Sequence, residues 1–238
     1  MPIPQLTPAI SVKHLQVFLR VHRRWQYLED VFKQIKELGR GRIVTVTVQT
    51  DRTSIDVFRE LARIETRLPT HVLTEIHEGP QILNERQNWL LSIKTLYDFA
   101  DSDADAGIVW DDDWLFSKLG LREMRAHLEL LEFDRIEAKW LHCWDNHQQH
   151  NALFPEHWAA CLFRMYPRDQ WKRLMAHCPD FVSRSPRVHR ADFDIYHLGY
   201  MDPEDRRKAW EAYRAAGKID GHSLCLVKEP DLKEIEWQ

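Results

Sequence analysis

The chain has 238 residues, of which 44% are hydrophobic and 29% are charged, and its formal net charge at pH 7 is −4. This composition supplies a core for a large globular domain and is typical of a soluble enzyme. The 8 glycines are too few for a glycine-rich phosphate loop or a glycine linker. The small negative charge gives no general attraction to nucleic acid or to anionic membranes.

No signal peptide and no membrane-spanning stretch is recognisable in the sequence. The apolar run at 158–163 is far shorter than the roughly 20 residues that a bilayer requires. The four cysteines form no CxxC pair, so reduced thiols are expected. We therefore expect a cytoplasmic protein without an integral membrane segment.

The first half of the chain alternates strands and helices with short connections. Strands are predicted at 14–20, 43–48, 71–76 and 107–110, and helices at 25–38, 53–68 and 84–100. The order β-α-β-α-β-α-β predicts an α/β fold with a Rossmann-like N-terminal half, in which helices flank a mostly parallel sheet.

The second half is less regular. Helices are predicted at 121–131, from Pro155 onward and at 202–217, and strands at 135–142, 188–196 and 224–227, before a polar end. No repeat, low-complexity segment or Pro/Gly/Ser linker interrupts the chain, so we predict a single domain over residues 1–238.

Charged residues follow each strand of the first half. They are His22 and Arg23, Asp51 and Arg52, His77 and Glu78, and Asp111, Asp112 and Asp113. Right-handed crossovers bring the carboxyl ends of parallel strands to one edge of the sheet, which is where such sheets bind ligands. A nucleotide site would need charges there, although a solvated edge would show them too.

Three consecutive carboxylates, Asp111 to Asp113, form the sharpest motif, between Trp110 and Trp114. Adjacent like charges repel, which favours a cation among them. Hard cations such as Mg²⁺ and Mn²⁺ take carboxylate oxygens together with substrate phosphate oxygens. The position of the run after a buried strand therefore predicts a metal and phosphate site, against the alternative of a solvated acidic turn.

A strand followed by Asp-x-Asp, about a hundred residues into such a half, resembles the DxD element of metal-dependent nucleotide-sugar glycosyltransferases of the GT-A fold. The likeness is strongest to their large inverting family. The segments Asn84-Glu-Arg-Gln-Asn88 and Tyr196-His-Leu-Gly-Tyr200, together with Asp51, are similar to further motifs of that family. In this order the motifs span roughly residues 15–215.

The resemblance implies a single GT-A-like domain with a nucleotide-sugar-binding half at about 14–113, an acceptor-binding half at about 114–220 and a C-terminal tail at 221–238. It implies a site whose metal ligands are Asp111, Asp113 and His197, with Mn²⁺ or Mg²⁺ as the cofactor. Asp51 would contact the base, Arg86 the diphosphate, and Asp111 or Asp112 the ribose. We add His22 and Arg23, from the same sheet edge, to the nucleotide-binding residues.

The implied reaction moves a sugar from a nucleoside-diphosphate sugar, with a UDP-sugar as the expected donor, to an acceptor hydroxyl with inversion. A carboxylate general base would deprotonate that hydroxyl. The family's Glu-Asp pair is missing from the expected window. Asp180 lies at a suitable distance and Asp145 follows a predicted strand, so both are candidates. The acceptor stays open among a glycan, a protein, a lipid and a modified DNA base.

Other interpretations of the same residues remain. A metal-dependent phosphoryl or nucleotidyl transferase could use Asp111 and Asp113 to hold two ions. The cluster His142, Cys143, His147, His150 and His157 could bind zinc, although its spacing fits no structural zinc pattern.

Eight of the ten tryptophans fall into two groups. Four of them fall on apolar stripes or a strand and are expected in the core: Trp25, Trp89, Trp140 and Trp210. A second group is expected to offer sugar contacts: Trp110, Trp114, Trp144 and Trp158.

Overall fold

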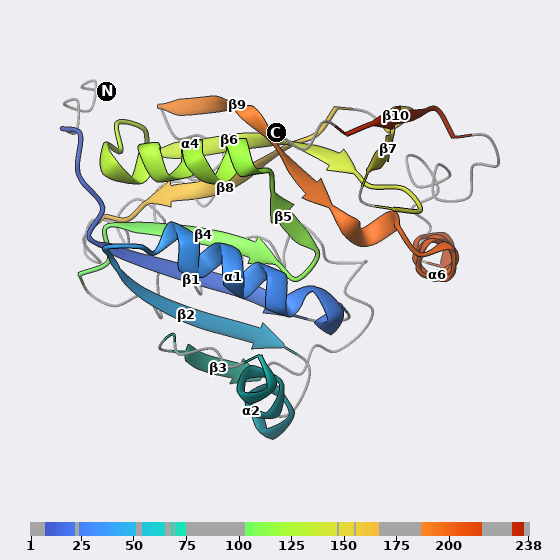
Figure 1. The fold of residues 1–238 in the computed structure, drawn as a ribbon, viewed down its shortest axis with the longest axis horizontal. Coiled ribbons are helices and arrows are strands. Elements are labelled where there is room, and N and C mark those ends of the chain that lie inside the picture. Colours follow the sequence, from blue (N-terminus) through green and yellow to red (C-terminus); the bar gives the residue numbers. More distant parts are fainter. Residues whose placement is uncertain are drawn as a thin grey trace.

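An eight-stranded sheet runs through the part of the chain that the computed structural model describes (Figure 1). The described residues are 8–21, 24–50, 54–64, 68, 70–74, 103–146, 148–154, 156–166, 187–215 and 230–235. The order of strands in the sheet is β3-β2-β1-β4-β8-β6-β9-β5, and a separate antiparallel pair joins β10 to β7.

The strands are β1 (His14–Val21), β2 (Ile43–Thr50), β3 (Thr70–Thr74), β4 (Ala106–Asp111), β5 (Trp114–Phe116), β6 (Arg135–His142), β7 (Gln149–Asn151), β8 (Trp158–Arg164), β9 (Val188–His197) and β10 (Leu232–Glu234). The helices are α1 (Leu28–Leu38), α2 (Ser54–Arg63), α4 (Lys118–Glu129) and α6 (Pro203–Ala215), with 3₁₀ turns η1 (Trp25–Tyr27) and η4 (Leu198–Tyr200). Helices α1 and α4 pack together over one face of the sheet (Figure 1).

The first half of the sheet is parallel, as predicted. Strand β1 pairs in parallel with both β2 and β4, and β2 pairs in parallel with β3. The side chains of β1 and β2 are buried on both faces, which explains their continuous apolar and β-branched runs. The carboxyl ends of β1, β2 and β4 therefore lie at one edge, and the register sets Arg20 opposite Asp111 there.

The second half of the sheet is mixed. Strand β8 runs antiparallel to β4 and β6, β5 runs antiparallel to β9, and β6 pairs in parallel with β9. The helix predicted from Pro155 is wrong, because residues 158–164 form β8. Its first residues alternate between half-buried and buried, and its place between β4 and β6 pairs its backbone on both sides.

The polar end of the chain also holds a strand that the sequence did not suggest. Residues 232–234 form β10, which pairs antiparallel with β7. The helix predicted at 84–100 and the strand predicted at 224–227 lie outside the described residues. Within the described part of the chain, no helix has both the length and the apolar character needed to cross a bilayer.

A turn between the first helix and the second strand depends on a glycine. Helix α1 buries Val31, Phe32 and Ile35 on one face and ends at Gly39. A Cβ atom at Gly39 would lie 2.3 Å from Cγ2 of Val44, so the chain can pass this close to β2 only without a side chain. The close approach packs the end of α1 against the start of β2.

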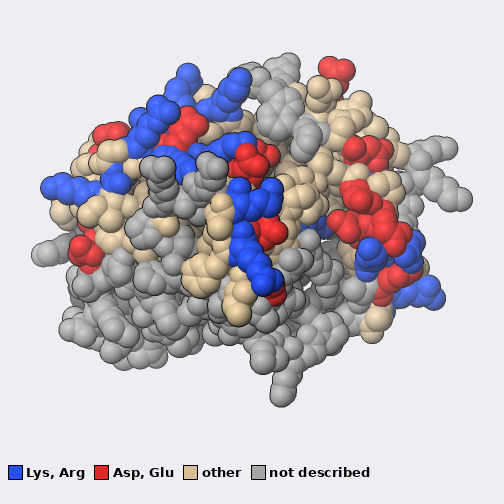
Figure 2. All heavy atoms as spheres, turned by 60° about the horizontal axis from the view of Figure 1, so that its bottom comes forward, with Lys and Arg blue, Asp and Glu red and all other residues tan. Residues whose placement is uncertain are grey.

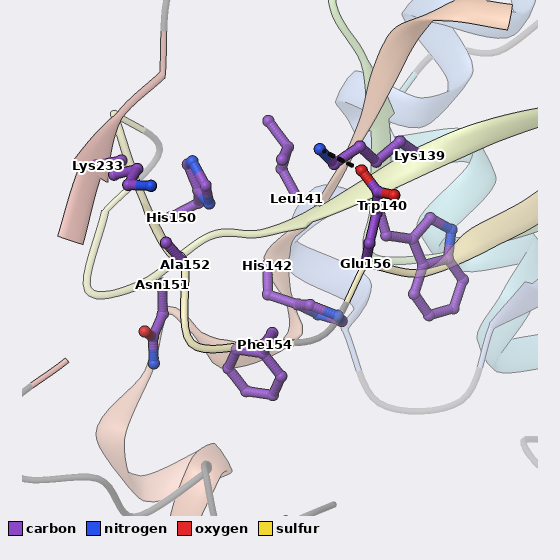
Figure 3. A pocket seen from close by; sticks show the side chains of 10 residues that line it. All are labelled: Lys139, Trp140, Leu141, His142, His150, Asn151, Ala152, Phe154, Glu156 and Lys233. Carbon is purple, nitrogen blue, oxygen red and sulfur yellow. Dashed lines mark ion pairs between the residues drawn. The ribbon is translucent and has the colours of Figure 1, made fainter. Parts of the chain in front are cut away.

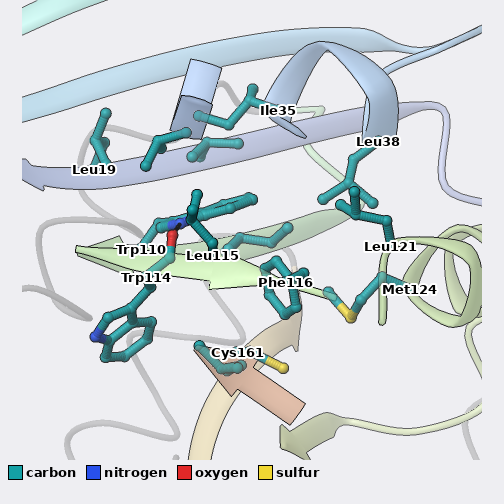
Figure 4. Close-up of a cluster of buried hydrophobic side chains, with 14 of the residues drawn as sticks. Leu19, Ile35, Leu38, Trp110, Trp114, Leu115, Phe116, Leu121, Met124 and Cys161 are labelled. Carbon is teal, nitrogen blue, oxygen red and sulfur yellow. Dashed lines mark hydrogen bonds between the residues drawn. The ribbon is translucent and has the colours of Figure 1, made fainter. Parts of the chain in front are cut away.

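The two tryptophans that flank the acidic turn belong to the hydrophobic core (Figure 4). Trp110 and Trp114 are 0% and 2% exposed, and the indole Nε1 of Trp110 donates to the Trp114 carbonyl at 2.8 Å. The Trp110 ring also meets Phe116 edge to face, with centroids 4.9 Å apart. The expectation that these two tryptophans contact a sugar is therefore wrong: both rings are buried, Trp110 against Phe116 and Trp114 against Trp140 of β6.

Asp134 links the start of β6 to the start of β9. Its Oδ1 accepts hydrogen bonds from Arg187 Nη2 at 2.6 Å and from the Tyr166 hydroxyl at 2.6 Å, and its side chain is 3% exposed. Burial alone would raise the pKa of Asp134, but the bonds from Arg187 and Tyr166 outweigh it and lower the pKa below the ordinary 3.8.

We predict that Asp134→Asn lowers the free energy of unfolding at pH 7 by about 1.5–3 kcal/mol, the usual value of hydrogen bonds to a charged group. A carboxyl whose folded-state pKa is lowered stabilises the fold above its unfolded pKa and loses this effect as the pH falls through the folded pKa. The difference in the free energy of unfolding between wild type and variant should therefore shrink as the pH falls below 3.8, the ordinary pKa of this side chain. Urea unfolding between pH 7 and pH 3 measures it. Asp192→Asn, on an exposed position of β9, is the control and should leave stability nearly unchanged.

Candidate active site

The acidic turn sits at the carboxyl ends of β1 and β4, and its first carboxylate is paired with an arginine. Nε and Nη2 of Arg20 donate to the two carboxylate oxygens of Asp111. Burial raises the pKa of Asp111, the charge of Arg20 opposes this rise, and the charge of Asp113 adds to it. The two-pronged bond therefore compensates the charge of a carboxylate that lies beside two others.

Asp112 ties the segment after β1 to the turn. Its Oδ2 accepts the backbone N–H of Arg24 at 2.9 Å, and its own N–H donates to the Arg20 carbonyl at 3.0 Å. Its side chain is buried. Asp112 thus fixes the backbone of Arg24 at a place from which the Arg24 side chain reaches Asp113.

Asp113 is the meeting point of the two halves of the sheet. Its Oδ2 accepts a hydrogen bond from Arg24 Nη1 at 2.5 Å and lies 3.3 Å from Nε2 of His197. The carboxylate is almost fully buried. Burial alone would raise the pKa of Asp113, but His197 and Arg24 outweigh it and hold that pKa well below its usual range.

Arg24 is held on several sides. Its Nη2 donates to the Gly199 carbonyl at 2.8 Å, and its Nε lies 3.7 Å from Asp205 Oδ2. Burial alone would lower the pKa of Arg24, but the nearby carboxylates Asp113, Asp112 and Asp205 raise it. One guanidinium thus joins the acidic turn to η4 and α6.

His197, at the end of β9, is oriented by its neighbours. Its ring stacks on Trp140 with centroids 5.0 Å apart and an interplanar angle of 18°. Its Nδ1 is 2.8 Å from Nδ1 of His142, so one imidazole donates to the other. Burial and the charges of His197 and His157 hold the pKa of His142 well below 6.5, which keeps that ring neutral at pH 7. Nε2 of His197 is thereby directed at Asp113.

Asp113 and His197 together could supply two of the ligands that a divalent cation needs. Asp113 Oδ2 and His197 Nε2 are 3.3 Å apart, close enough for two ligands of one Mn²⁺ or Mg²⁺, whose bonds are about 2.1 Å long. Both oxygens of Asp111 are engaged by Arg20, and among the described residues no three His, Cys, Asp or Glu side chains form a metal-binding group. The described protein thus provides two ligands, and substrate phosphates and water commonly complete such sites.

Asp145, one of the two predicted bases, is placed by the structure beside α6. It follows the buried Trp144 with a φ of 60°, and its Oδ1 accepts a hydrogen bond from Arg206 Nη2 at 2.7 Å. The guanidinium of Arg206 lies 4.1 Å over the Trp144 ring. The other predicted site residues lie outside the described part of the chain: His22, Arg23, Asp51, Arg86 and Asp180.

The zinc interpretation has little support among the described residues. Cys143 is buried, and burial raises the pKa of its thiol to about 12, which disfavours the thiolate that zinc requires. His142 bonds to His197 instead, and His147 lies outside the described residues.

Sequence reasoning missed the arginines and one tryptophan of this site. Arg20 ends a predicted strand, and only the register with β4 reveals its pairing with Asp111. Trp140 packs against the core, as expected, and in addition its ring supports His197, a role that the sequence did not suggest. On the face shown in Figure 2, basic and acidic side chains of the described residues are interspersed.

We predict that Gly199→Ala disturbs the contact between Asp113 and His197. A Cβ atom at position 199 would lie 2.9 Å from Asp113 Oδ2 and 2.9 Å from Nε2 of His197, so one group must shift. Overpacking of this kind costs about 1–3 kcal/mol, and the NMR signals of the His197 imidazole should move. Gly41→Ala, which meets open space but has a φ of 76°, tests backbone strain alone and should leave those signals in place. Unchanged His197 signals in Gly199→Ala would contradict the geometry.

No protein-family model and no curated protein matches this sequence. Solved structures do match. The mannosyltransferase PcManGT from Pyrobaculum calidifontis, in complex with GDP-Man and Mn²⁺, gives a TM-score of 0.50 at 11% identity, over 93% of this chain and 76% of that one. TarS 1–349 from S. aureus, in complex with UDP-GlcNAc, gives 0.48 at 12% identity, over 85% and 65% of the two chains.

A protein described as a glucose-1-phosphate thymidylyltransferase, from Bacillus anthracis, gives a TM-score of 0.46 at 9% identity, over 87% of this chain and 96% of that one. This chain spans slightly less than two thirds of TarS 1–349. At these identities the likeness concerns the fold. The likeness to PcManGT confirms the predicted α/β architecture, a mixed sheet flanked by helices in a GT-A-like fold.

Proposed function

We propose that this protein is a glycosyltransferase that moves a sugar from a nucleoside-diphosphate sugar, with a UDP-sugar as the expected donor, to an acceptor hydroxyl with inversion. The observation that carries the proposal is the pair formed by Asp113 and His197 at the ligand-binding edge of a GT-A-type sheet. In this proposal residues 14–113 bind the nucleotide and residues 114–220 bind the acceptor.

Asp113 and His197 would hold the divalent cation, Mn²⁺ or Mg²⁺, and Asp111 would join them only if Arg20 releases it. A bound cation supplies charge stabilisation where the departing diphosphate becomes more negative. Arg20 and Arg24 bring two more positive groups to the same edge. Because glycine is scarce and no P-loop is present in the sequence, side-chain charges of this kind are a suitable means of holding phosphates.

The remaining nucleotide contacts follow the sequence resemblance. Asp51 would contact the base, Arg86 the diphosphate and Asp112 the ribose, with His22 and Arg23 beside them. In the structure Asp112 accepts a hydrogen bond from the Arg24 backbone, so this side chain also helps to hold the segment after β1 in place. A nucleotide contact from Asp112 would therefore add to that bond.

The general base is proposed to be Asp145 or Asp180. Arg206 engages Oδ1 of Asp145, and the side chain is 49% exposed, so its other oxygen is open to an acceptor hydroxyl. A carboxylate in this position would take the hydroxyl proton as the oxygen attacks the anomeric carbon. Turnover that is kept in Asp145→Asn and lost in Asp180→Asn would assign the base to Asp180.

We predict that one nucleoside diphosphate among UDP, GDP, CDP and dTDP raises the melting temperature together with Mn²⁺, and that Asp113→Ala loses the part that depends on Mn²⁺. Ligands that bind only the folded state stabilise it by mass action, by about 2.7 kcal/mol at a hundredfold excess over Kd. Differential scanning fluorimetry measures the shift, and Asp192→Ala, on an exposed position of β9, is the matched control. A response to metal alone, with none to any diphosphate, would contradict the glycosyltransferase proposal.

We further predict that Arg24→Met raises the affinity for Mn²⁺ about tenfold. In the wild type the cation must displace the partly buried guanidinium of Arg24 from Asp113, and one such charged bond is worth about 1.5–3 kcal/mol. Electron paramagnetic resonance of free Mn²⁺ measures the binding. Arg122→Met, an exposed arginine of α4, should leave the affinity unchanged. Equal affinities in wild type and Arg24→Met would show that Mn²⁺ binds elsewhere.

A further inference from the structure

A pocket of about 270 Å³ opens between the end of β6, strand β7 and the residues Ala152, Phe154 and Glu156 (Figure 3). His142 forms part of its lining and is also the residue that bonds to His197. His142 therefore lies between the pocket and His197, one of the proposed cation ligands. Pockets that hold drug-sized ligands measure about 300–1,000 Å³, so this one suits a single ring.

The pocket contains aromatic surface. The ring centroids of His142 and Phe154 lie 4.4 Å apart, and those of Phe154 and Tyr200 lie 4.9 Å apart. Figure 3 shows His142 and Phe154 side by side along the pocket lining. The C–H groups of one face of a pyranose ring can pack against aromatic rings of this kind.

Paired charges lie at one end of the pocket. Lys139 Nζ and Glu156 Oε1 are 2.9 Å apart, and both side chains remain partly exposed. An ammonium beside a carboxylate places donors next to acceptors. Adjacent hydroxyl groups on a ring match this arrangement, because each can accept from the lysine and donate to the glutamate.

The other end of the pocket carries a further positive charge. Lys233 of β10 lies opposite His150 of β7 and forms no ion pair with another of the described residues. Burial and then the charges of Lys233 and Lys139 lower the pKa of His150, while the weaker effect of Asp231 opposes them, so the two lysines outweigh Asp231 at this histidine. The lining thus holds two lysines against one glutamate.

We propose that this pocket binds the acceptor as a glycan residue, a pyranose ring that carries an anionic group beside Lys233. The proposal rests on the proposed function, because it names the acceptor of that reaction. The ring packs against His142 and Phe154, its hydroxyls bond to Lys139 and Glu156, and the anionic group is drawn to Lys233. The acid group can be a carboxylate or a phosphate, since both are recognised by the same ammonium.

The test is a binding titration without donor and without metal, so that it does not depend on the proposed reaction. Methyl β-D-glucuronide, methyl β-D-glucoside 6-phosphate and neutral methyl β-D-glucoside are added to the whole protein. The imidazole C–H signals of His142 and His150 are followed by NMR. We expect a saturable shift of both histidines with at least one anionic glycoside, at least tenfold tighter than with the neutral one, and weakened by added salt.

Lys233→Met should weaken binding of the anionic glycosides about tenfold and leave the neutral one unchanged. Lys33→Met, an exposed lysine of α1 that does not line the pocket, is the matched control and should change neither. The response to glucuronide against that to the 6-phosphate tells which acid the pocket prefers. Equal affinity for the neutral and anionic glycosides, no effect of Lys233→Met, or no shift of the two histidines would each overturn the proposal.

Failure of the acceptor pocket can be distinguished from failure of the proposed glycosyltransferase function. Stabilisation by Mn²⁺ and a nucleoside diphosphate without any histidine shift would keep the glycosyltransferase and remove this acceptor. Histidine shifts without any response to nucleoside diphosphates would keep the sugar pocket and remove the donor.

Discussion

Three adjacent carboxylates at the end of a buried strand must be compensated, and the structure does so with two arginines and a histidine from distant parts of the chain. Arg20 bonds to Asp111, the Arg24 backbone bonds to Asp112, and Asp113 receives both the Arg24 side chain and His197. Without these partners the buried charges would repel one another at a cost of several kcal/mol. The acidic turn therefore requires that β1, β4 and β9 come together at one edge.

The rest of the fold supports this requirement. The rings of Trp110 and Trp114 fill the space beneath the turn, and Trp140 orients His197 from the other half of the sheet. Arg24 extends the connection to η4 through Gly199 and to α6 through Asp205. These contacts hold Asp113 and His197 at 3.3 Å from each other, and a shared cation would depend on this distance.

Elements whose signal is local could be predicted from the sequence. The strands at 14–21 and 43–50 are long apolar or β-branched runs, and α1 has buried residues at helical spacing and a glycine where it ends. The strand at 158–164 could not be predicted, because Pro155 imitates a helix start and a short apolar run has no clear period. Its two neighbours in the sheet decide its conformation, and they lie far away in the sequence.

The candidate site shows the same limit. The acidic run and His197 carry a recognisable pattern, and the structure brings Asp113 and His197 together. Arg20, Arg24 and Trp140 have no pattern of their own, because their roles arise from register and from packing across the sheet. Charges that neutralise a site are therefore harder to predict than the charges that define it.

The central claim is that Asp113 and His197 share a divalent cation with a nucleoside diphosphate. Mn²⁺ is paramagnetic and broadens the NMR signals of nuclei near it, so the His197 imidazole reports its position directly. We predict that Mn²⁺ added with the stabilising nucleoside diphosphate broadens the His197 signals selectively, while those of the distant His127 on α4 stay sharp. Sharp His197 signals in a protein saturated with Mn²⁺ and nucleotide would contradict it.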